Sequence, residues 1–80
     1  MFALRGTLGT ATTGSNNVAL GYGSLLSVSA GSSNVAIGAN AGSTLTTGGN
    51  NILIGNSVQA NIGNTSSNQL NIGNWIYGNG

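Results

Sequence analysis

Four short segments, each with an aliphatic residue at its first and third positions and an Asn or Gln just before it, recur along the chain at a nearly constant spacing. The segments are Val18-Ala19-Leu20, Val35-Ala36-Ile37, Ile52-Leu53-Ile54 and Leu70-Asn71-Ile72. A glycine that we predict to be a turn residue ends each segment, and the period is 17, 17 and then 18: Gly21, Gly38, Gly55 and Gly73. Short aliphatic runs at period two, bounded by Gly and Asn, predict β-strands.

The alternation divides each segment between two faces, because successive side chains of a strand point to opposite sides. The outer two residues of each segment share one face, and the middle residue shares the other face with the preceding Asn or Gln. The larger aliphatic residues are the expected interior ones. We therefore predict a structural core made of Val18, Leu20, Val35, Ile37, Ile52, Ile54, Leu70 and Ile72.

The second half of each period shows a weaker alternation with an apolar middle residue. The aligned triplets are Thr10-Ala11-Thr12, Ser27-Val28-Ser29, Thr44-Leu45-Thr46 and Asn61-Ile62-Gly63. This pattern predicts a second short strand, so that one period supplies two strands and two turns.

A single repeat unit cannot bury its own apolar face, but stacked units can. The sequence therefore predicts an all-β parallel β-solenoid, a β-roll or β-helix, with strands of successive coils about 4.8 Å apart. We expect one domain over residues 1–80, with a partial first coil at 1–13 and repeats at about 14–30, 31–47, 48–64 and 65–80. Stacked side-chain amides are expected to bond one another in a ladder of Asn17, Asn34, Asn51 and Asn68.

The ends of the predicted rod carry no recognisable cap. Natural solenoids cover their terminal strand edges with polar or charged elements. In phase with the repeat, residues 78–80 would reach the second strand of the last coil, where a following subunit could begin. This match predicts, as one alternative, a filament of subunits that stack head to tail.

Composition removes most chemical functions from consideration. The chain has one charged residue, Arg5, and no Asp, Glu, His or Cys. General acid–base catalysis, nucleophile activation and metal binding all need those residue types, so we expect no enzyme, no cofactor and no metal site. One arginine cannot neutralise a phosphate backbone, so nucleic acid is not an expected partner. No apolar run approaches the ~20 residues of a membrane span.

The unit Asn-Val-Ala-Ile-Gly, with its Gly/Ser/Asn-rich turns, resembles two families of fibrous proteins. One is the head repeats of YadA-like trimeric autotransporter adhesins. The closer resemblance is to phage tail-fibre proteins, in which such repeats precede an endosialidase-type intramolecular chaperone. Residues 67–78 resemble the stretch that closes this repeat region. The resemblance covers residues 10–78 and implies an intertwined or side-by-side homotrimer in a virion tail or on a cell surface.

The resemblance implies a structural fibre module that spaces or presents a receptor-binding tip for host attachment, with a host surface glycan or protein as partner. The alternatives that remain open are the head-to-tail extracellular filament and, third, an ice-binding or glycan-binding solenoid. The ice-binding alternative rests on the hydroxyl rows Thr10/Thr12, Ser27/Ser29 and Thr44/Thr46.

Two aromatic residues are the candidates for a ligand contact or for a junction with another domain or subunit. Trp75 and Tyr77 stand at alternate positions, so both rings are expected on one face of a strand. Tyr22 occupies a position that varies freely between repeats and is expected to be a surface or packing residue. Arg5 is expected to be a solvated charge at a strand edge.

Overall fold

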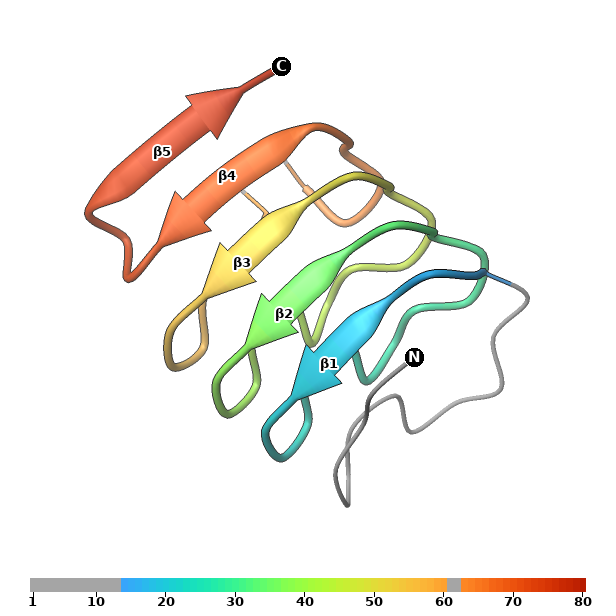
Figure 1. Cartoon of the computed structure of the whole chain (residues 1–80), viewed down its shortest axis with the longest axis horizontal. Coiled ribbons are helices and arrows are strands. Elements are labelled where there is room, and N and C mark those ends of the chain that lie inside the picture. Colours follow the sequence, from blue (N-terminus) through green and yellow to red (C-terminus); the bar gives the residue numbers. More distant parts are fainter. Residues whose placement is uncertain (1–13, 61–62) are drawn as a thin grey trace.

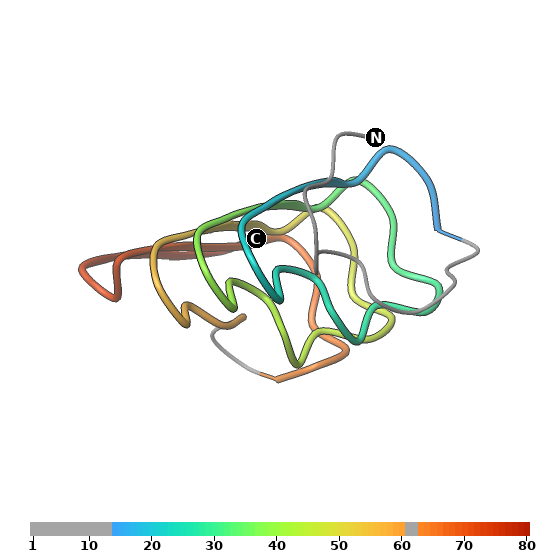
Figure 2. The same cartoon turned by 90° about the horizontal axis from the view of Figure 1, so that it is seen from below.

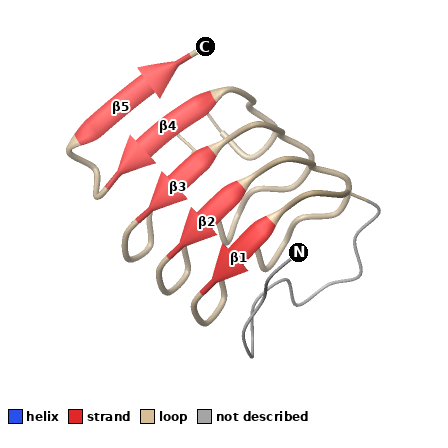
Figure 3. Ribbon diagram, viewed as in Figure 1, coloured by secondary structure: helices blue, strands red, loops and turns tan. Residues whose placement is uncertain are grey.

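The chain is all-β over the residues that the structure describes. The computed structural model describes residues 14–60 and 63–80, and these form strands, turns and irregular segments without a helix (Figure 3). Five strands make one sheet in chain order (Figure 1): β1 (Val18–Leu20), β2 (Val35–Ile37), β3 (Ile52–Ile54), β4 (Gln69–Ile72) and β5 (Ile76–Asn79).

The first four strands run parallel and pair at the spacing of the sequence repeat. Val18 pairs with Val35 and Leu20 with Ile37, and β2 and β3 pair in the same way one repeat further on. Between β3 and β4 the register is one position longer, with Ile54 opposite Ile72. The predicted alignment of equivalent residues in neighbouring strands is therefore confirmed. Viewed from below, the sheet lies edge-on and the connections hang from one side of it (Figure 2).

The extra residue of the last repeat lies in a connection and not in a strand. Gly42 N–H still donates to Val58 O, in the same register as Leu25 N–H donates to Ala41 O. Thr46 N–H then donates to Asn64 O, whereas the equivalent bond from Ser29 N–H to Thr46 O would predict Gly63 as the acceptor. The register thus shifts between Val58 and Asn64.

The prediction of which strand face is interior was wrong. The eight aliphatic residues predicted as core are all exposed or half-buried: Val18, Leu20, Val35, Ile37, Ile52, Ile54, Leu70 and Ile72. The buried face carries the middle residues of the strands, and the connections add further side chains. The apolar core consists of Ala19, Leu25, Val28, Ala36, Ala41, Leu45, Leu53 and Val58.

The physical reason is the thickness of the layer behind the sheet. Leucine and valine side chains from the connections fill that layer, so the facing strand positions can hold only small residues in the first two repeats. A Cβ on Gly42 would lie 2.9 Å from Leu25 Cδ2 and 3.0 Å from Leu53 Cδ1, which shows how closely these side chains meet. The larger aliphatic residues are left on the opposite face of the sheet.

The predicted second strand does not form in the two periods in which the structure describes all of its residues. Residues 27–29 and 44–46 are turns and irregular backbone. Their middle residues, Val28 and Leu45, are nevertheless buried, as an inward-pointing position requires. The equivalent residues at 10–12 and at 61–62, like the predicted partial first coil, lie outside the described residues.

Buried asparagines join the repeats through the backbone. Asn34 N–H donates to Asn17 Oδ1 at 2.9 Å, and Asn51 N–H donates to Asn34 Oδ1 at 3.0 Å. Each Nδ2 donates in turn to a carbonyl oxygen of the following connection, as Asn34 does to Gly48 O at 2.9 Å. The expectation that the amides bond one another was therefore wrong. The side-chain amides of these asparagines take the place of backbone hydrogen bonds where neighbouring repeats diverge at a turn.

The last member of this series is Gln69 and not Asn68. Because the last repeat is one position longer, Gln69 N–H donates to Asn51 Oδ1 at 2.9 Å, and Gln69 is buried. Asn68 is exposed and has φ of 61°, like Asn16, Ser33 and Asn50 at the same place in the earlier repeats.

A glycine directly after each parallel strand permits the turns to stack. Gly21, Gly38 and Gly55 have φ of 121°, 126° and 129°, a region that side-chain-bearing residues rarely adopt. A Cβ on Gly38 would lie 2.6 Å from Gly55 O. Close approach of successive backbones thus requires glycine here.

The chain reverses after β4. Gly73 and Asn74 have φ of 61° and 62°, the sign that both central residues of a type I′ turn require, and Trp75 N–H donates to Ile72 O at 3.0 Å. Strand β5 then pairs antiparallel with β4, with Asn71 opposite Tyr77. The predicted continuation of residues 78–80 into a second strand of a fourth coil was wrong. The β4 edge is instead covered by a hairpin strand.

Candidate functional site

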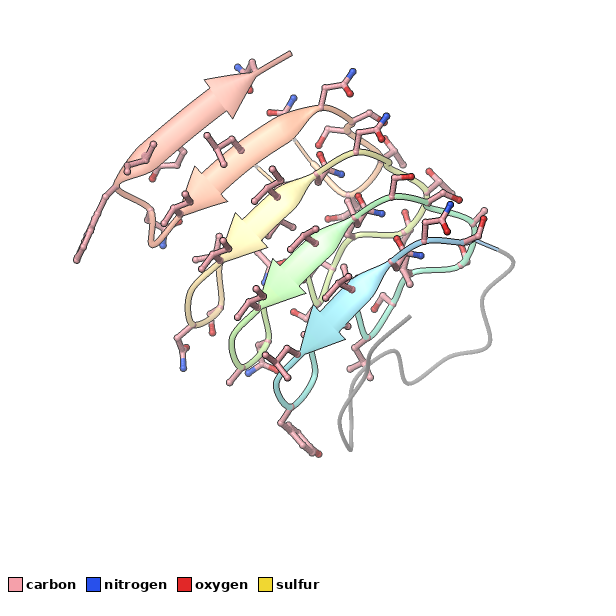
Figure 4. The ribbon with its side chains drawn as sticks, in the orientation of Figure 1. Carbon is pink, nitrogen blue, oxygen red and sulfur yellow. The ribbon has the colours of Figure 1, made fainter. Side chains whose placement is uncertain are left out.

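One face of the sheet carries two columns of aliphatic side chains that we call the outer face. The first column is Val18, Val35, Ile52 and Leu70, and the second is Leu20, Ile37, Ile54 and Ile72, with Ile76 of β5 beside it. Carbon-only side chains are visible in rows along these strands (Figure 4). The exposed fractions of Val18, Ile52 and Ile76 are 37%, 43% and 54%. Exposed aliphatic clusters are common at interaction surfaces, so the outer face is a candidate for one.

No charged side chain accompanies this face within residues 14–60 and 63–80. The single charged side chain of the sequence is Arg5, which lies outside the described residues. A partner for the outer face would therefore be recognised by shape and apolar contact, because the face offers no ion pair.

The two candidate aromatic residues do not share a strand face. Trp75 lies in the turn between β4 and β5, and 88% of its surface is exposed. Tyr77 lies in β5 opposite Asn71, so its ring is on the side of the sheet where the core lies, and 58% of its surface is exposed. The predicted pair is thus split between a turn and the inner side of the sheet. Tyr22 is exposed, as expected of a variable turn position.

A cavity of about 300 Å³ lies beside Tyr77. Its walls come from the turn that follows β3 and from the β4–β5 hairpin: Ser57, Gln59, Ala60, Asn71, Asn74 and Tyr77. The cause is the reversal of the chain. In the earlier repeats, the turn after one strand stacks on the turn after the next strand. Asn40 N–H, for example, donates to Tyr22 O at 2.8 Å. After β4 the chain turns back into β5, and the 57–60 turn receives no such cover from the hairpin.

Hydrogen bonds fix the polar walls of the cavity. Asn71 is 3% exposed; its Nδ2 donates to Gln59 O and to Asn74 Oδ1, each at 3.0 Å, and its Oδ1 accepts from Asn74 N–H at 3.0 Å. The Tyr77 hydroxyl donates to Asn74 O at 2.8 Å, which holds the ring across the turn. The arrangement can present amides and one aromatic ring to a small polar molecule.

Sequence reasoning missed Asn71, Gln59 and Asn74 as site residues, although a signal was present. At the inward strand position the repeats have Ala19, Ala36 and Leu53, and then the polar Asn71. A polar residue at one member of an otherwise apolar series indicates either an end of the core or a site. The sequence predicts the larger aliphatic residues as the interior, and on that prediction Asn71 falls on the solvent-exposed side of the sheet, where a polar residue is ordinary.

The hydroxyl rows considered for ice binding are partly engaged within the molecule. Thr46 Oγ1 donates to Asn64 O at 3.2 Å, and Thr44 Oγ1 donates to Gln59 Oε1 at 3.0 Å. Two threonines that would anchor a regular array thus donate their hydroxyl protons to the next repeat. The first row, Thr10/Thr12, lies outside the described residues.

Comparison with protein-family models, with curated proteins and with solved structures gave no match for this chain. Among the described residues, no helix is long and apolar enough to cross a lipid bilayer.

Proposed function

We propose that the chain is a structural module: a β-solenoid that associates as a homotrimer through the outer face and forms a segment of a phage tail fibre or other surface appendage. In this role the rod spaces or presents a receptor-binding tip for attachment to a host surface. The proposal is of a non-catalytic protein, and the sequence supports it by offering no carboxylate, imidazole or thiol side chain.

The observation that carries the proposal is the pair of aliphatic columns on the outer face. The columns place like residues at equal steps along the sheet, Val18 above Val35 and Leu20 above Ile37. Copies of one chain arranged about a symmetry axis would bring the same columns together along their whole length. Burial of such side chains is the main favourable term in protein association.

The hairpin at β5 bears on the filament alternative. A filament that continues the parallel stack would need the next strand at the place where Ile76–Asn79 pairs antiparallel with β4. A side-by-side trimer keeps the pairing of β5 with β4 in each chain. We favour the trimer over the filament for that reason.

Sedimentation velocity at micromolar concentration tests the proposal. A trimer has three times the 7.8 kDa mass of one chain. The substitution Ile37→Lys puts a charge at the centre of the outer face, and we expect it to give a folded monomer, because an unpaired charge in an apolar interface is destabilising by several kcal/mol. Thr47→Lys, at an exposed position in a connection, adds the same charge elsewhere and is the matched control. A parent chain that sediments as a monomer would overturn the trimer.

A further inference from the structure

At the cavity between the 57–60 turn and the β4–β5 hairpin, two positions carry amide side chains where the described earlier repeats have apolar residues or glycine. Asn71 occupies the strand position at which the earlier repeats have Ala19, Ala36 and Leu53. Gln59 occupies the connection position of Gly42 in the preceding repeat and of Leu25, a core residue, in the repeat before that. The side of the sheet that holds the core therefore turns polar at this one end, where the cavity opens.

Some polar groups of the cavity are held by hydrogen bonds within the chain, and others are available to bind a ligand. Asn71 makes three hydrogen bonds to Gln59 and Asn74, so its amide is a fixed support. Asn74 uses its backbone and its Oδ1 in those contacts, and its Nδ2 makes no hydrogen bond within the described part of the chain. Ser57 Oγ donates to Asn56 Oδ1 at 2.9 Å and retains lone pairs that can accept. A donor and an acceptor thus flank the same opening.

The Tyr77 ring supplies an apolar wall. Its hydroxyl is tied to Asn74 O, so the orientation of the ring is set by the hairpin. More than half of the residue is exposed, although it lies on the inner side of the sheet. An aromatic ring beside amide and hydroxyl groups matches a molecule with apolar C–H faces and hydroxyls at its rim.

We infer that this cavity binds one neutral sugar unit, a single hexose-sized ring that packs on Tyr77 and hydrogen-bonds to Asn74 and Ser57. The walls that the described residues form contain no charged side chain, which disfavours an anionic ligand because a desolvated charge would have no partner there. About 300 Å³ is at the lower limit of small-molecule sites and suits one ring. The inference does not rest on association through the outer face, since the lining residues of the cavity come from one chain.

The test is a two-dimensional ¹H–¹⁵N NMR titration of the full chain with glucose, galactose, mannose and N-acetylglucosamine. N-acetylneuraminic acid is the charged comparison. We expect at least one neutral sugar to shift the amide signals of residues 57–60 and 71–77 in a saturable way, with a dissociation constant on the order of 1 mM, as about a dozen non-hydrogen atoms allow. Titration with the methyl glycoside of the sugar that binds shows whether the site accepts that sugar as the terminal unit of a glycan or only as the free sugar.

Matched tyrosine variants identify the site. Tyr77→Ala should weaken binding by on the order of tenfold, whereas Tyr22→Ala, which removes an exposed tyrosine on the turn after β1, should leave it unchanged. Tyr77→Phe keeps the ring but loses the bond to Asn74 O, so it should bind more weakly than the parent and more tightly than Tyr77→Ala. Asn74→Gly keeps the positive φ and removes the amide, so it should also weaken binding.

The inference is overturned if none of the four neutral sugars moves these amide signals at 50-fold the expected constant, about 50 mM. Equal shifts in the Tyr77→Ala chain, or tighter binding of the charged sugar, would overturn it as well. The sedimentation result does not enter this test, so failure of the sugar site and failure of the trimer are separate outcomes.

Discussion

The side-chain oxygen of Asn34 accepts a hydrogen bond from the backbone N–H of Asn51, 3.0 Å away, and so ties two neighbouring repeats through a fully buried amide. The same amide donates to Gly48 O at 2.9 Å. One side chain thus satisfies two backbone groups that would otherwise be buried without partners.

Replacing this amide should destabilise the chain strongly. Asn34→Ala leaves Asn51 N–H and Gly48 O unpaired in the interior, and each such group costs about 1–3 kcal/mol, so we expect a loss of about 2–6 kcal/mol. The free energy of unfolding in urea measures it. Asn64→Ala, at an exposed asparagine, should change this energy by less than about 0.5 kcal/mol. Equal effects of the two substitutions would show that the buried amide has no special role.

Asn34→Asp should introduce a pH dependence with a defined sign. A protonated carboxyl can donate to Gly48 O and accept from Asn51 N–H, as the amide does, whereas the ionised form cannot donate. Burial raises the pKa of this carboxyl in the folded state above its unfolded value of about 4. The contribution of the protonated carboxyl to the free energy of unfolding is therefore present below about pH 4 and is lost as the pH rises through the folded-state pKa. Urea unfolding at about pH 3.5 and pH 7.5 should differ by at least ~2 kcal/mol, in favour of the lower pH.

The parent chain should show no such dependence. It has no Asp, Glu, His, Cys or Lys, and its stability can change with pH only through groups that titrate differently in the folded and unfolded states. We expect the free energy of unfolding to stay within about 1 kcal/mol between pH 4.5 and pH 8.5. An unfolding transition centred in this interval would contradict the expectation.

Substitutions at two neighbouring residues of β3 should distinguish an effect on folding from an effect on association. Leu53 is fully buried, and Leu53→Ala should cost about 2–5 kcal/mol because it opens a cavity. Ile52 is 43% exposed on the outer face, and Ile52→Ala should have an effect of less than about 1 kcal/mol on the unfolding of the isolated chain while weakening the proposed trimer. Urea unfolding and sedimentation velocity are measured on both. If Ile52→Ala unfolds the chain as Leu53→Ala does, the outer face is not a free surface.

Trp75 should behave as a hydrated side chain. Because 88% of it is exposed, its fluorescence maximum should differ little between the folded and urea-unfolded chain, and acrylamide should quench it readily. Trp75→Ala should change the free energy of unfolding by less than about 0.5 kcal/mol. A strongly blue-shifted maximum would mean that another surface covers the indole.

The repeat spacing was sufficient to predict which residues pair across the parallel strands, because side-chain alternation and the turn glycines fix the register. It did not predict which face is interior. Alternation gives two faces, and the choice depends on how much space the connections leave behind the sheet. Leu25 and Val58 come from connections whose own pattern is weak, yet they fill that space and favour alanine at 19 and 36.

The hairpin could have been recognised from Gly73-Asn74, since both residue types tolerate positive φ and an apolar residue stands on either side. Asn74 became a site residue only once the reversal was known, whereas Tyr77 was a candidate from the sequence and the reversal places it on the inner side of the sheet. No local pattern marks Ser57 or Gln59. They line the cavity because the chain reverses after β4 and no further turn stacks on the 57–60 turn.

The amides of Asn17 and Asn34 each bond to the repeat that follows and to no repeat beyond it, as Asn17 does to Asn34 and Asn34 to Asn51. Such nearest-neighbour coupling makes stability grow with the number of repeats, and it allows unfolding to begin at one end and advance repeat by repeat. Hydrogen exchange would then be slowest in β2, β3 and β4, which have paired strands on both sides, and faster toward the ends of the described chain.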